Sequence, residues 1–282
     1  MTSHRRIYVR APNHLGDGVM AIPAIAALRR VAGEVIVAAP RWGGELYRAL
    51  DVSVVPRGEV PDADAALLLA PSFRAAWEAR RLPRRVGLRT DHRWPLLTDA
   101  IKPLRRHRMD DFAALAAALG AQVDGPPRFA PTPDERAAAT VPEGHLALNP
   151  LSPSGPPVMW RGFERLAERS ERPVVFYAGP GDALDTSHPT RIGQPLGALA
   201  ASLERAHAML SNDSGLAHFA RAVGVPTVVI YGSTAPGFTA PAGSIAVEGP
   251  DPGCRPCYKK RCPYAGVPCL DIPVETVERA LP

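Results

Sequence analysis

The chain has 282 residues, of which 46% are hydrophobic and 32 are prolines, and its formal net charge is +5. This length predicts two domains, because an average domain has about 150 residues, and the hydrophobic content excludes a disordered chain. The longest apolar runs are much shorter than the roughly 20 residues of a membrane span, and the start MTSHRR shows no secretory leader. We therefore expect a cytoplasmic protein with no transmembrane span.

The first half alternates strand-like and helical patterns. Strands are predicted at 6–11, 34–39, 51–55 and 65–70. Helices are predicted at 17–31 with an interruption at Pro23, at 43–50, and at 112–119 behind a cap at Asp110-Asp111. Because alternating strands and helices indicate a mostly parallel sheet, we expect a Rossmann-like domain over residues 1–125.

A strongly basic segment lies within this half. From Arg80 to Arg108 it holds ten Lys or Arg residues against two acids. X-Pro steps such as Leu82-Pro83 favour an irregular connection over one basic helix. The segment predicts an anion-binding face, with a solvated arginine-rich surface as the alternative. No nucleic-acid-binding motif accompanies it, so nucleic acid is not an expected partner.

The second half repeats the pattern after a proline-rich linker predicted at 126–144, and forms a second domain over 145–282. Strands are predicted at 145–148, 173–177, 208–211 and 225–231, and helices at 160–169, 198–206 and from Gly215 onward. Open parallel sheets bind ligands beyond the carboxyl ends of their strands. This rule selects the loops at 12–17, 149–156, 179–186, 211–215 and 232–237.

Residues 211–236 combine a polar turn, a helix, a reversal and a buried strand. Asn212, Asp213 and Ser214 are N-cap residue types, and Gly215 lets the backbone approach a ligand. Amides at a helix N-terminus and the helix dipole favour an anion by roughly 0.3–1 kcal/mol per charge. The stretch predicts a diphosphate site, with a capped structural helix as the alternative.

The first predicted strand leads into the turn Asn13-His14-Leu15-Gly16-Asp17-Gly18. Asp17 has two interpretations, a helix cap or a general base at the edge of a cleft. The run from Gly16 to Ala21 also fits a loose G-x-G-x-x-A dinucleotide motif. Since the next strand is followed by Arg41 and not by an acid, an oxidoreductase would use NADP.

The cysteines are clustered in one loop over 254–269. Cys254, Cys257, Cys262 and Cys269 follow the pattern C-x2-C-x4-C-x6-C. Such spacing is typical of a closed zinc site or, less often, an iron–sulfur cluster. Free thiols and disulfides are the other interpretations, although disulfides are unusual in the cytosol. A zinc ion here would be structural, because four thiolates leave no open position.

Two regions, 11–30 and 211–236, resemble the signature regions of glycosyltransferase family 9. In that family a strand leads into Leu-Gly-Asp, and a distal Asn-Asp-Ser/Thr-Gly-x-x-His helix precedes a Pro-initiated strand that ends in Tyr/Phe-Gly and Thr/Ser-x-Pro. The counterparts here are Leu15-Gly16-Asp17, Asn212 to His218, Pro226 to Gly232, and Ser233-Thr234-Ala235-Pro236. The resemblance implies an α/β fold of GT-B type, two Rossmann-like domains whose parallel sheets face an interdomain cleft.

The resemblance also implies an inverting transfer of heptose from ADP-heptose to a lipopolysaccharide inner-core or related glycan, with no cofactor required for catalysis. Asp17 would be the catalytic base. Donor-binding residues would be Asp213, Ser214, Gly215, His218, Gly179, Ser233, Thr234 and Arg161. The acceptor would be an anionic glycolipid at the inner membrane face, where the enzyme would be peripheral. Acceptor-binding residues would be Asn13, His14, Arg84, Arg85 and Arg89.

One motif departs from the family pattern. Where relatives have Gly-Pro-Ala-Lys-Arg-Trp, this chain has Gly155-Pro156-Pro157-Val158-Met159-Trp160, so the basic pair that would neutralise the diphosphate is missing. Arg161 is the nearest substitute, and the family's acid after Gly179 is matched only by Asp182 or Asp185. The departure keeps a noncatalytic sugar-nucleotide-binding or metal-binding relative open as an alternative, beside the NADP-dependent oxidoreductase.

Overall fold

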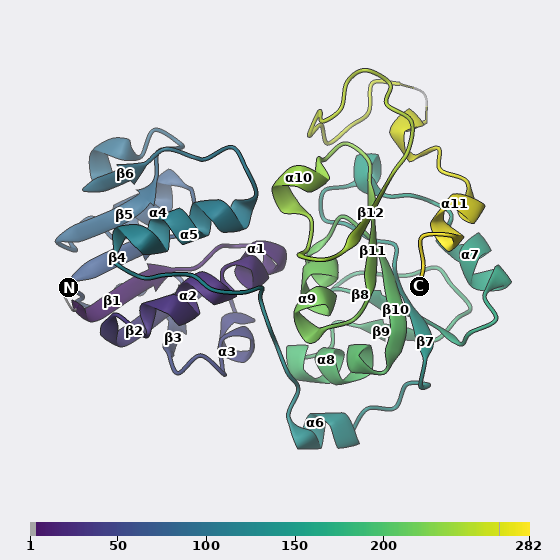
Figure 1. Ribbon diagram of the computed structural model, residues 1–282, viewed down its shortest axis with the longest axis horizontal. Coiled ribbons are helices and arrows are strands. Elements are labelled where there is room, and N and C mark those ends of the chain that lie inside the picture. Colours follow the sequence, from purple (N-terminus) through teal and green to yellow (C-terminus); the bar gives the residue numbers. More distant parts are fainter. Residues whose placement is uncertain (1–3, 265) are drawn as a thin grey trace. The chain divides into compact units, whose positions relative to one another are not determined.

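The computed structural model describes residues 4–264 and 266–282. The chain divides into two compact units, Met1–Pro127 and Arg128–Pro282. Each unit contains one six-stranded sheet in which all paired strands run parallel. Figure 1 shows the helices packed around each sheet.

Unit 1 has the strand order β3-β2-β1-β4-β5-β6. Its strands are β1 His4–Arg10, β2 Ala32–Ala39, β3 Ser53–Pro56, β4 Ala65–Leu68, β5 Arg84–Leu88 and β6 Asp99–Ile101. Its helices are α1 Leu15–Met20, α2 Ile22–Leu28, α3 Gly43–Leu46, α4 Phe73–Glu78 and α5 Arg108–Ala118. The central strands are fully buried at Ile7, Val9 and Leu67, which explains their unbroken apolar runs.

Three sequence predictions for unit 1 need correction. The helix expected at 17–31 is two helices that meet at Ala21, with Pro23 in the first turn of α2, where its missing N–H breaks no bond. The cap of α5 is His107, whose ring accepts a hydrogen bond from Met109 N at 3.3 Å, and not Asp110-Asp111. The basic segment 80–108 is not an irregular connection, because it contains β5 and β6.

Unit 2 has the strand order β12-β11-β10-β7-β8-β9. Its strands are β7 His145–Asn149, β8 Val174–Ala178, β9 Thr190–Ile192, β10 Ala206–Asn212, β11 Thr227–Tyr231 and β12 Ile245–Glu248. Its helices are α6 Pro133–Ala137, α7 Phe163–Arg169, α8 Leu196–Glu204, α9 Gly215–Val223, α10 Pro236–Thr239 and α11 Val274–Glu278.

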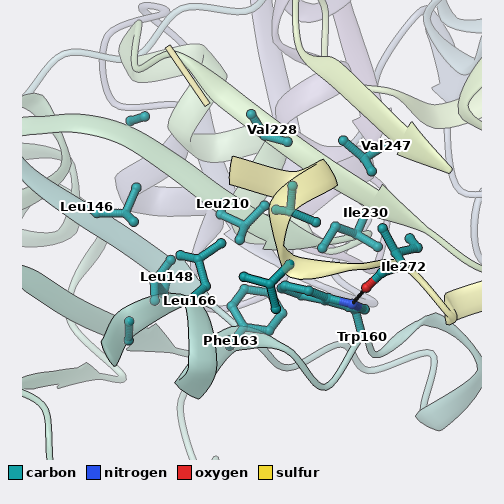
Figure 2. Close-up of a cluster of buried hydrophobic side chains, with 14 of the residues drawn as sticks. Leu146, Leu148, Trp160, Phe163, Leu166, Leu210, Val228, Ile230, Val247 and Ile272 are labelled. Atoms are coloured by element: carbon teal, nitrogen blue, oxygen red, sulfur yellow. Dashed lines mark hydrogen bonds between the residues drawn. The ribbon is translucent and has the colours of Figure 1, made fainter. Parts of the chain in front are cut away.

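Both faces of the unit 2 sheet are covered. On one face Leu148, Leu210 and Ile230 belong to a buried cluster with Phe163 of α7, and Figure 2 shows these side chains pointing together. Trp160 Nε1 donates a hydrogen bond to Ile272 O at 2.9 Å, which ties the C-terminal segment to this cluster. On the other face α9 packs against Val229 and Tyr231. The sheet therefore holds its strand ends, and the loops that follow them, in fixed places.

The proline-rich segment expected as a linker packs on unit 2 from Arg128 onward. Phe129 N donates to Ala222 O at 2.8 Å, and the Phe129 ring lies 4.9 Å from the ring of Phe219. Helix α6 begins with a capping box between Thr132 and Glu135. Among the described residues, no helix is long and apolar enough to cross a bilayer.

Candidate active site

The start of α9 is built by a network of buried polar side chains. Asn149 Nδ2 donates to Ser211 Oγ at 3.0 Å and to Ser214 Oγ at 2.7 Å. Ser214 occupies the N-cap position, but its side chain makes no capping hydrogen bond to the helix. The predicted capping role is therefore wrong for this side chain, because its oxygen is engaged by Asn149. Consequently the Ser214 side chain does not compete with an anion for the first-turn amides of α9.

Asn212 also links loops and does not cap the helix. It lies at the end of β10, where its Oδ1 accepts from Trp160 N at 3.0 Å and its Nδ2 donates to Pro150 O at 2.6 Å. Ser152 Oγ donates to Asp213 O at 2.7 Å. These bonds join the loop after β7 to the loop after β10. The two strands are neighbours in the sheet, and both loops follow their carboxyl ends, where the sequence places them.

The loop after β11 joins the same group. Ser233 is buried, and its N–H donates to Pro157 O at 3.1 Å. The Thr234 Oγ1 and Tyr231 hydroxyl atoms are buried, and neither has a hydrogen-bond partner within 4–264 and 266–282. Burial first, then the negative charges of Asp213 and Glu248, raise the pKa of Tyr231. Since a buried hydroxyl without a partner is costly, these two groups indicate a polar ligand.

Three other expected donor residues lie on this side of unit 2 with different surroundings. His218 is buried on α9. Gly179 follows β8, and its N–H donates to Asp182 Oδ2 at 2.8 Å, so Asp182 closes its own loop. Arg161 lines a cavity of about 980 Å³ together with the C-terminal segment 266–275. The role of Arg161 as a substitute for the missing basic pair therefore stays a prediction.

In unit 1, Asp17 lies in the first turn of α1 behind the N-cap residue His14. The capping alternative for Asp17 is therefore wrong. Its side chain is 32% exposed, and its Oδ1 lies 4.0 Å from Arg108 Nε. Burial raises the pKa of Asp17, and the charges of Arg108 and His14 oppose that shift. A carboxylate with a raised pKa and an open side is suited to accept a proton.

The expected acceptor residues separate into two groups at opposite edges of the unit 1 sheet. Asn13, His14 and Arg89 follow the carboxyl ends of β1 and β5. Arg84 and Arg85 lie at the amino end of β5, and parallel strands place that end away from Asp17. Arg84 Nη2 donates to Asp99 Oδ1 at 3.0 Å, and Arg85 Nε donates to Leu96 O at 2.6 Å. Position and bonding both count against Arg84 and Arg85 as acceptor ligands.

A basic cavity of about 620 Å³ lies at the carboxyl edge of the same sheet. Its polar lining includes Arg10, Asn13, Arg41, Arg57, Arg74 and Glu78. Asn13 Oδ1 accepts from Arg10 Nη2 at 3.1 Å and from Arg57 Nη1 at 3.4 Å. Glu78 accepts from Arg10 Nε at 3.3 Å and from Arg74 Nε at 2.8 Å.

One carboxylate against four guanidinium groups leaves this lining with an excess of three positive charges. Sequence reasoning missed the cavity, because its residues are far apart along the chain. A signal was nevertheless present. Arg10 ends β1, and Arg41, Arg57 and Arg74 each follow the end of the next strand, β2, β3 and β4. A basic residue after each of four neighbouring strands predicts an anion site at their common edge.

Comparisons with known proteins match the segment of unit 2 that contains this candidate site. Residues 194–267, which contain α9 and β11, match the family model of glycosyltransferase family 9 (heptosyltransferase). The resemblance to glycosyltransferase family 9 is confirmed. The lipopolysaccharide heptosyltransferase 1 of Pseudomonas aeruginosa is 44% identical over 70 residues, which are 24% of this chain and 20% of that protein. The matched stretch thus spans about a fifth of the length of this curated relative.

Solved structures show a similar fold over nearly the whole chain. The ADP-heptose lipopolysaccharide heptosyltransferase II of E. coli has a TM-score of 0.77 at 21% identity, over 98% of this chain and 97% of that one. A family 9 glycosyltransferase of Veillonella parvula has a TM-score of 0.78 at 21% identity, over 99% and 97%. The predicted α/β fold of GT-B type, with two Rossmann-like units, is confirmed.

The basic pair of the family 9 pattern is replaced in this chain by Val158 and Met159, and the structure shows where the first of these residues lies. Val158, one of its two replacements, is fully buried in the hydrophobic core of unit 2. A lysine at this position would bury a charged group. Among the described residues of this unit, the first-turn amides of α9 and the hydroxyl of Thr234 are groups that can bind a polar ligand.

The cysteine loop of this chain contains free thiols. Cys254, Cys257 and Cys262 are partly exposed, and Cys269 is buried. Burial first, then the charges of Cys257 and Cys262, raise the pKa of Cys254, so these thiols lie near one another. Over the described part of the chain, however, no group of three or more His, Cys, Asp or Glu side chains is arranged to hold a metal ion. The thiols are gathered but do not form the closed tetrahedral site that zinc requires.

Proposed function

We propose that this protein is an inverting glycosyltransferase that moves heptose from ADP-heptose to an anionic glycan, the lipopolysaccharide inner core or a related one. The observation that carries the proposal is the start of α9, where the N-cap side chain is held by Asn149. In the loop after β11, the hydroxyl of Thr234 has no hydrogen-bond partner among the described residues. The family 9 match covers this segment. The oxidoreductase alternative has no comparable support.

On the donor side, the diphosphate of ADP would lie against the first-turn amides of α9 at Gly215 and the residues after it. Negative charge grows on the diphosphate as the bond to the sugar breaks. Amides that are already oriented stabilise this charge without reorganising, and they need no cofactor to do so. The Thr234 hydroxyl would donate to the same group, and Asp213 would accept from a sugar hydroxyl.

On the acceptor side, Asp17 would remove the proton from the attacking hydroxyl. The acceptor oxygen forms a bond to the anomeric carbon on the face opposite to ADP, the bond from that carbon to the diphosphate oxygen breaks, and ADP leaves with its electron pair. The configuration therefore inverts, through a transition state with oxocarbenium character. The raised pKa of Asp17 makes its carboxylate a stronger base than an exposed aspartate.

The acceptor itself would carry an anionic group in the basic cavity of unit 1. The excess of positive charge in its lining supports this substrate class. We therefore replace Arg84 and Arg85 in the proposal by Arg41, Arg57 and Arg74, and keep Asn13, His14 and Arg89. A cytoplasmic location, where ADP-sugars are made, belongs to the same proposal.

A structural zinc ion in the cysteine loop is a separate proposal. The charges of Cys257 and Cys262 add to the effect of burial on the pKa of Cys254, so these sulfurs lie close together and support the proposal, whereas the described side-chain arrangement does not. Metal analysis of the purified protein decides between a zinc-bound cysteine loop and a loop with free thiols. Zinc at one equivalent supports the metal-bound loop, and metal-free protein with four titratable thiols contradicts it.

Thermal unfolding with nucleotides tests the proposed function. A ligand at 100 times its dissociation constant stabilises a protein by about 2.7 kcal/mol, so we expect ADP to raise the melting temperature and NADP to leave it unchanged. Thr234→Val should reduce the ADP effect, whereas Thr190→Val in β9 should not. A shift with NADP alone would favour the oxidoreductase. A shift with ADP but no heptose transfer to any glycan would favour a noncatalytic relative.

A further inference from the structure

The proposed base Asp17 is held from two sides within unit 1. On one side the residues around α3 pack on α1, where the Tyr47 hydroxyl donates a hydrogen bond to Gly18 O at 3.2 Å. A Cβ atom at Gly18 would overlap the Trp42 ring, so the absence of a side chain there lets the two segments approach. The backbone next to Asp17 is therefore fixed, which limits its carboxylate to rotations of its own side chain.

On the other side, Arg108 begins α5 and faces the carboxylate of Asp17. Arg108 follows the N-cap residue His107, and its Nε lies 4.0 Å from Asp17 Oδ1. The two side chains are similarly accessible, since Arg108 is 34% exposed and Asp17 is 32% exposed. A separation of 4.0 Å is too long for a hydrogen bond. The guanidinium therefore acts on Asp17 through its charge, and the carboxylate lone pairs stay free to accept a proton.

A second arginine–aspartate pair in the same unit shows the contrast. Arg84 donates two hydrogen bonds to Asp99, from Nη2 to Oδ1 at 3.0 Å and from Nε to Oδ2 at 3.2 Å. These bonds hold the pKa of Asp99 below its usual range, as expected for a carboxylate in a structural ion pair. At Asp17, burial raises the pKa, and the charge of Arg108 opposes that shift without reversing it. Asp17 thus keeps the basicity that Asp99 has lost.

The other titratable groups around α1 leave Arg108 as the main charge that opposes burial at Asp17. His14, at the N-cap of α1, opposes it less than Arg108 does. Tyr47 stays neutral, because burial and then the charge of Asp17 raise its pKa. Helix α2 carries no titratable side chain. The acids on α3 and in the first turn of α5 are Glu45, Asp110 and Asp111.

We infer that Arg108 is a positioning residue for the proposed transfer, because its charge keeps Asp17 ionised while its distance leaves the carboxylate free to take the acceptor proton. A base must be ionised before it can accept a proton, and burial by itself favours the neutral carboxyl group. The arginine side chain does not lose its charge over the pH range in which proteins work, so its effect on Asp17 is constant. The inference rests on the proposed function, in which Asp17 is the base.

An NMR titration of the Asp17 carboxyl group tests the inference without any turnover. The full-length protein is isotopically labelled at its aspartate carboxyl carbons, and Asp17→Asn identifies the signal of Asp17 by its loss. We expect the pKa of Asp17 to rise in Arg108→Gln and to return towards that of the unchanged protein in Arg108→Lys, which restores the charge. The matched control is Arg106→Gln, which removes an exposed arginine two positions earlier and should leave the pKa of Asp17 unchanged. The same pKa of Asp17 in Arg108→Gln and in the unchanged protein would overturn the inference.

The pH dependence of heptose transfer is the second readout. In Arg108→Gln we expect the rate to fall by about tenfold on the acid side, where fewer Asp17 side chains are ionised, and to equal that of the unchanged protein at alkaline pH. If thermal unfolding shows that this variant has lost its fold, Arg108→Met replaces it.

Two outcomes of the rate measurement would overturn the inference. A fall by the same factor at every pH would indicate a structural role of Arg108, and a higher KM for the acceptor at every pH would indicate that Arg108 binds the acceptor. If the unchanged protein transfers no heptose, the proposed function fails, whereas the titration of Asp17 still decides whether Arg108 keeps this carboxylate ionised.

Discussion

Gly232 offers a sharp test of how the loops of unit 2 are assembled. It follows β11, and a Cβ atom there would lie 2.2 Å from Pro157 O and 3.0 Å from Leu270 Cδ2. In Gly232→Ala the backbone at Pro157 must move by roughly 1 Å to restore ordinary contact. That movement would break the bond from Ser233 N to Pro157 O, which is 3.1 Å long.

The expected cost combines two effects. Overpacking of a close contact costs about 1–3 kcal/mol, and a lost hydrogen bond costs about 1 kcal/mol. We therefore expect the free energy of unfolding of Gly232→Ala to fall by about 2–4 kcal/mol in urea titrations. The stabilisation by ADP should fall as well, because Ser233 and Thr234 shift relative to the start of α9.

The matched control is Gly237→Ala. Gly237 lies in α10, and nothing is within 4 Å of a Cβ atom built there, so we expect unchanged or slightly higher stability. Equal stability of the two variants, with equal stabilisation by ADP, would refute the reasoning that Pro157 and Gly232 are held in close contact.

Two further predictions concern buried polar groups. Arg93→Met should lower the free energy of unfolding by about 3 kcal/mol or more, because buried carbonyl groups at Ala70 and Leu88 lose a charged donor; a loss as small as that of the surface variant Arg89→Met would contradict this. Burial lowers the pKa of His145 below 6.5, so the unfolded chain binds a proton at this residue more tightly than the folded protein does. The stabilisation of the folded protein that is present above pH 6.5 is therefore lost as the pH falls through the folded pKa. Urea unfolding at several pH values should show that the free energy of unfolding falls less on the acid side for His145→Gln than for the unchanged protein. The same fall in both proteins would refute the assignment of this loss to His145.

The elements that could be predicted from sequence are those with a continuous apolar signal. The run predicted at 225–231 agrees with β11 within two residues, and the helix predicted from Gly215 onward begins where α9 begins. The side chains of β11 are all buried in the sheet, and α9 packs on one face of that sheet, so local pattern and tertiary packing give the same answer. The segment 80–108 is different. Its strands are short, and the arginines that make it look like a surface include Arg93, which is fully buried.

The candidate site could also be predicted only in part from the sequence. Residue types at 212–214 indicated a helix start, but not that Asn149 would hold Ser214, because that bond joins positions 65 residues apart. The basic cavity depends on the order β3-β2-β1-β4, which brings Arg57, Arg41, Arg10 and Arg74 to one edge. Strand order is set by packing of the whole sheet and cannot be read from any single segment.

The most direct test of the central claim is the rate of ADP release from ADP-heptose in the presence of the glycan acceptor, for the unchanged protein and for Asp17→Asn. We expect a rate lower by about 10²–10⁴-fold in the variant. Burial raises the pKa of Asp17 above 3.8, so the stabilisation present below pH 3.8 is lost as the pH rises through the folded pKa, and the neutral asparagine should fold at least as stably at pH 7. A variant that transfers heptose at the full rate would contradict the account.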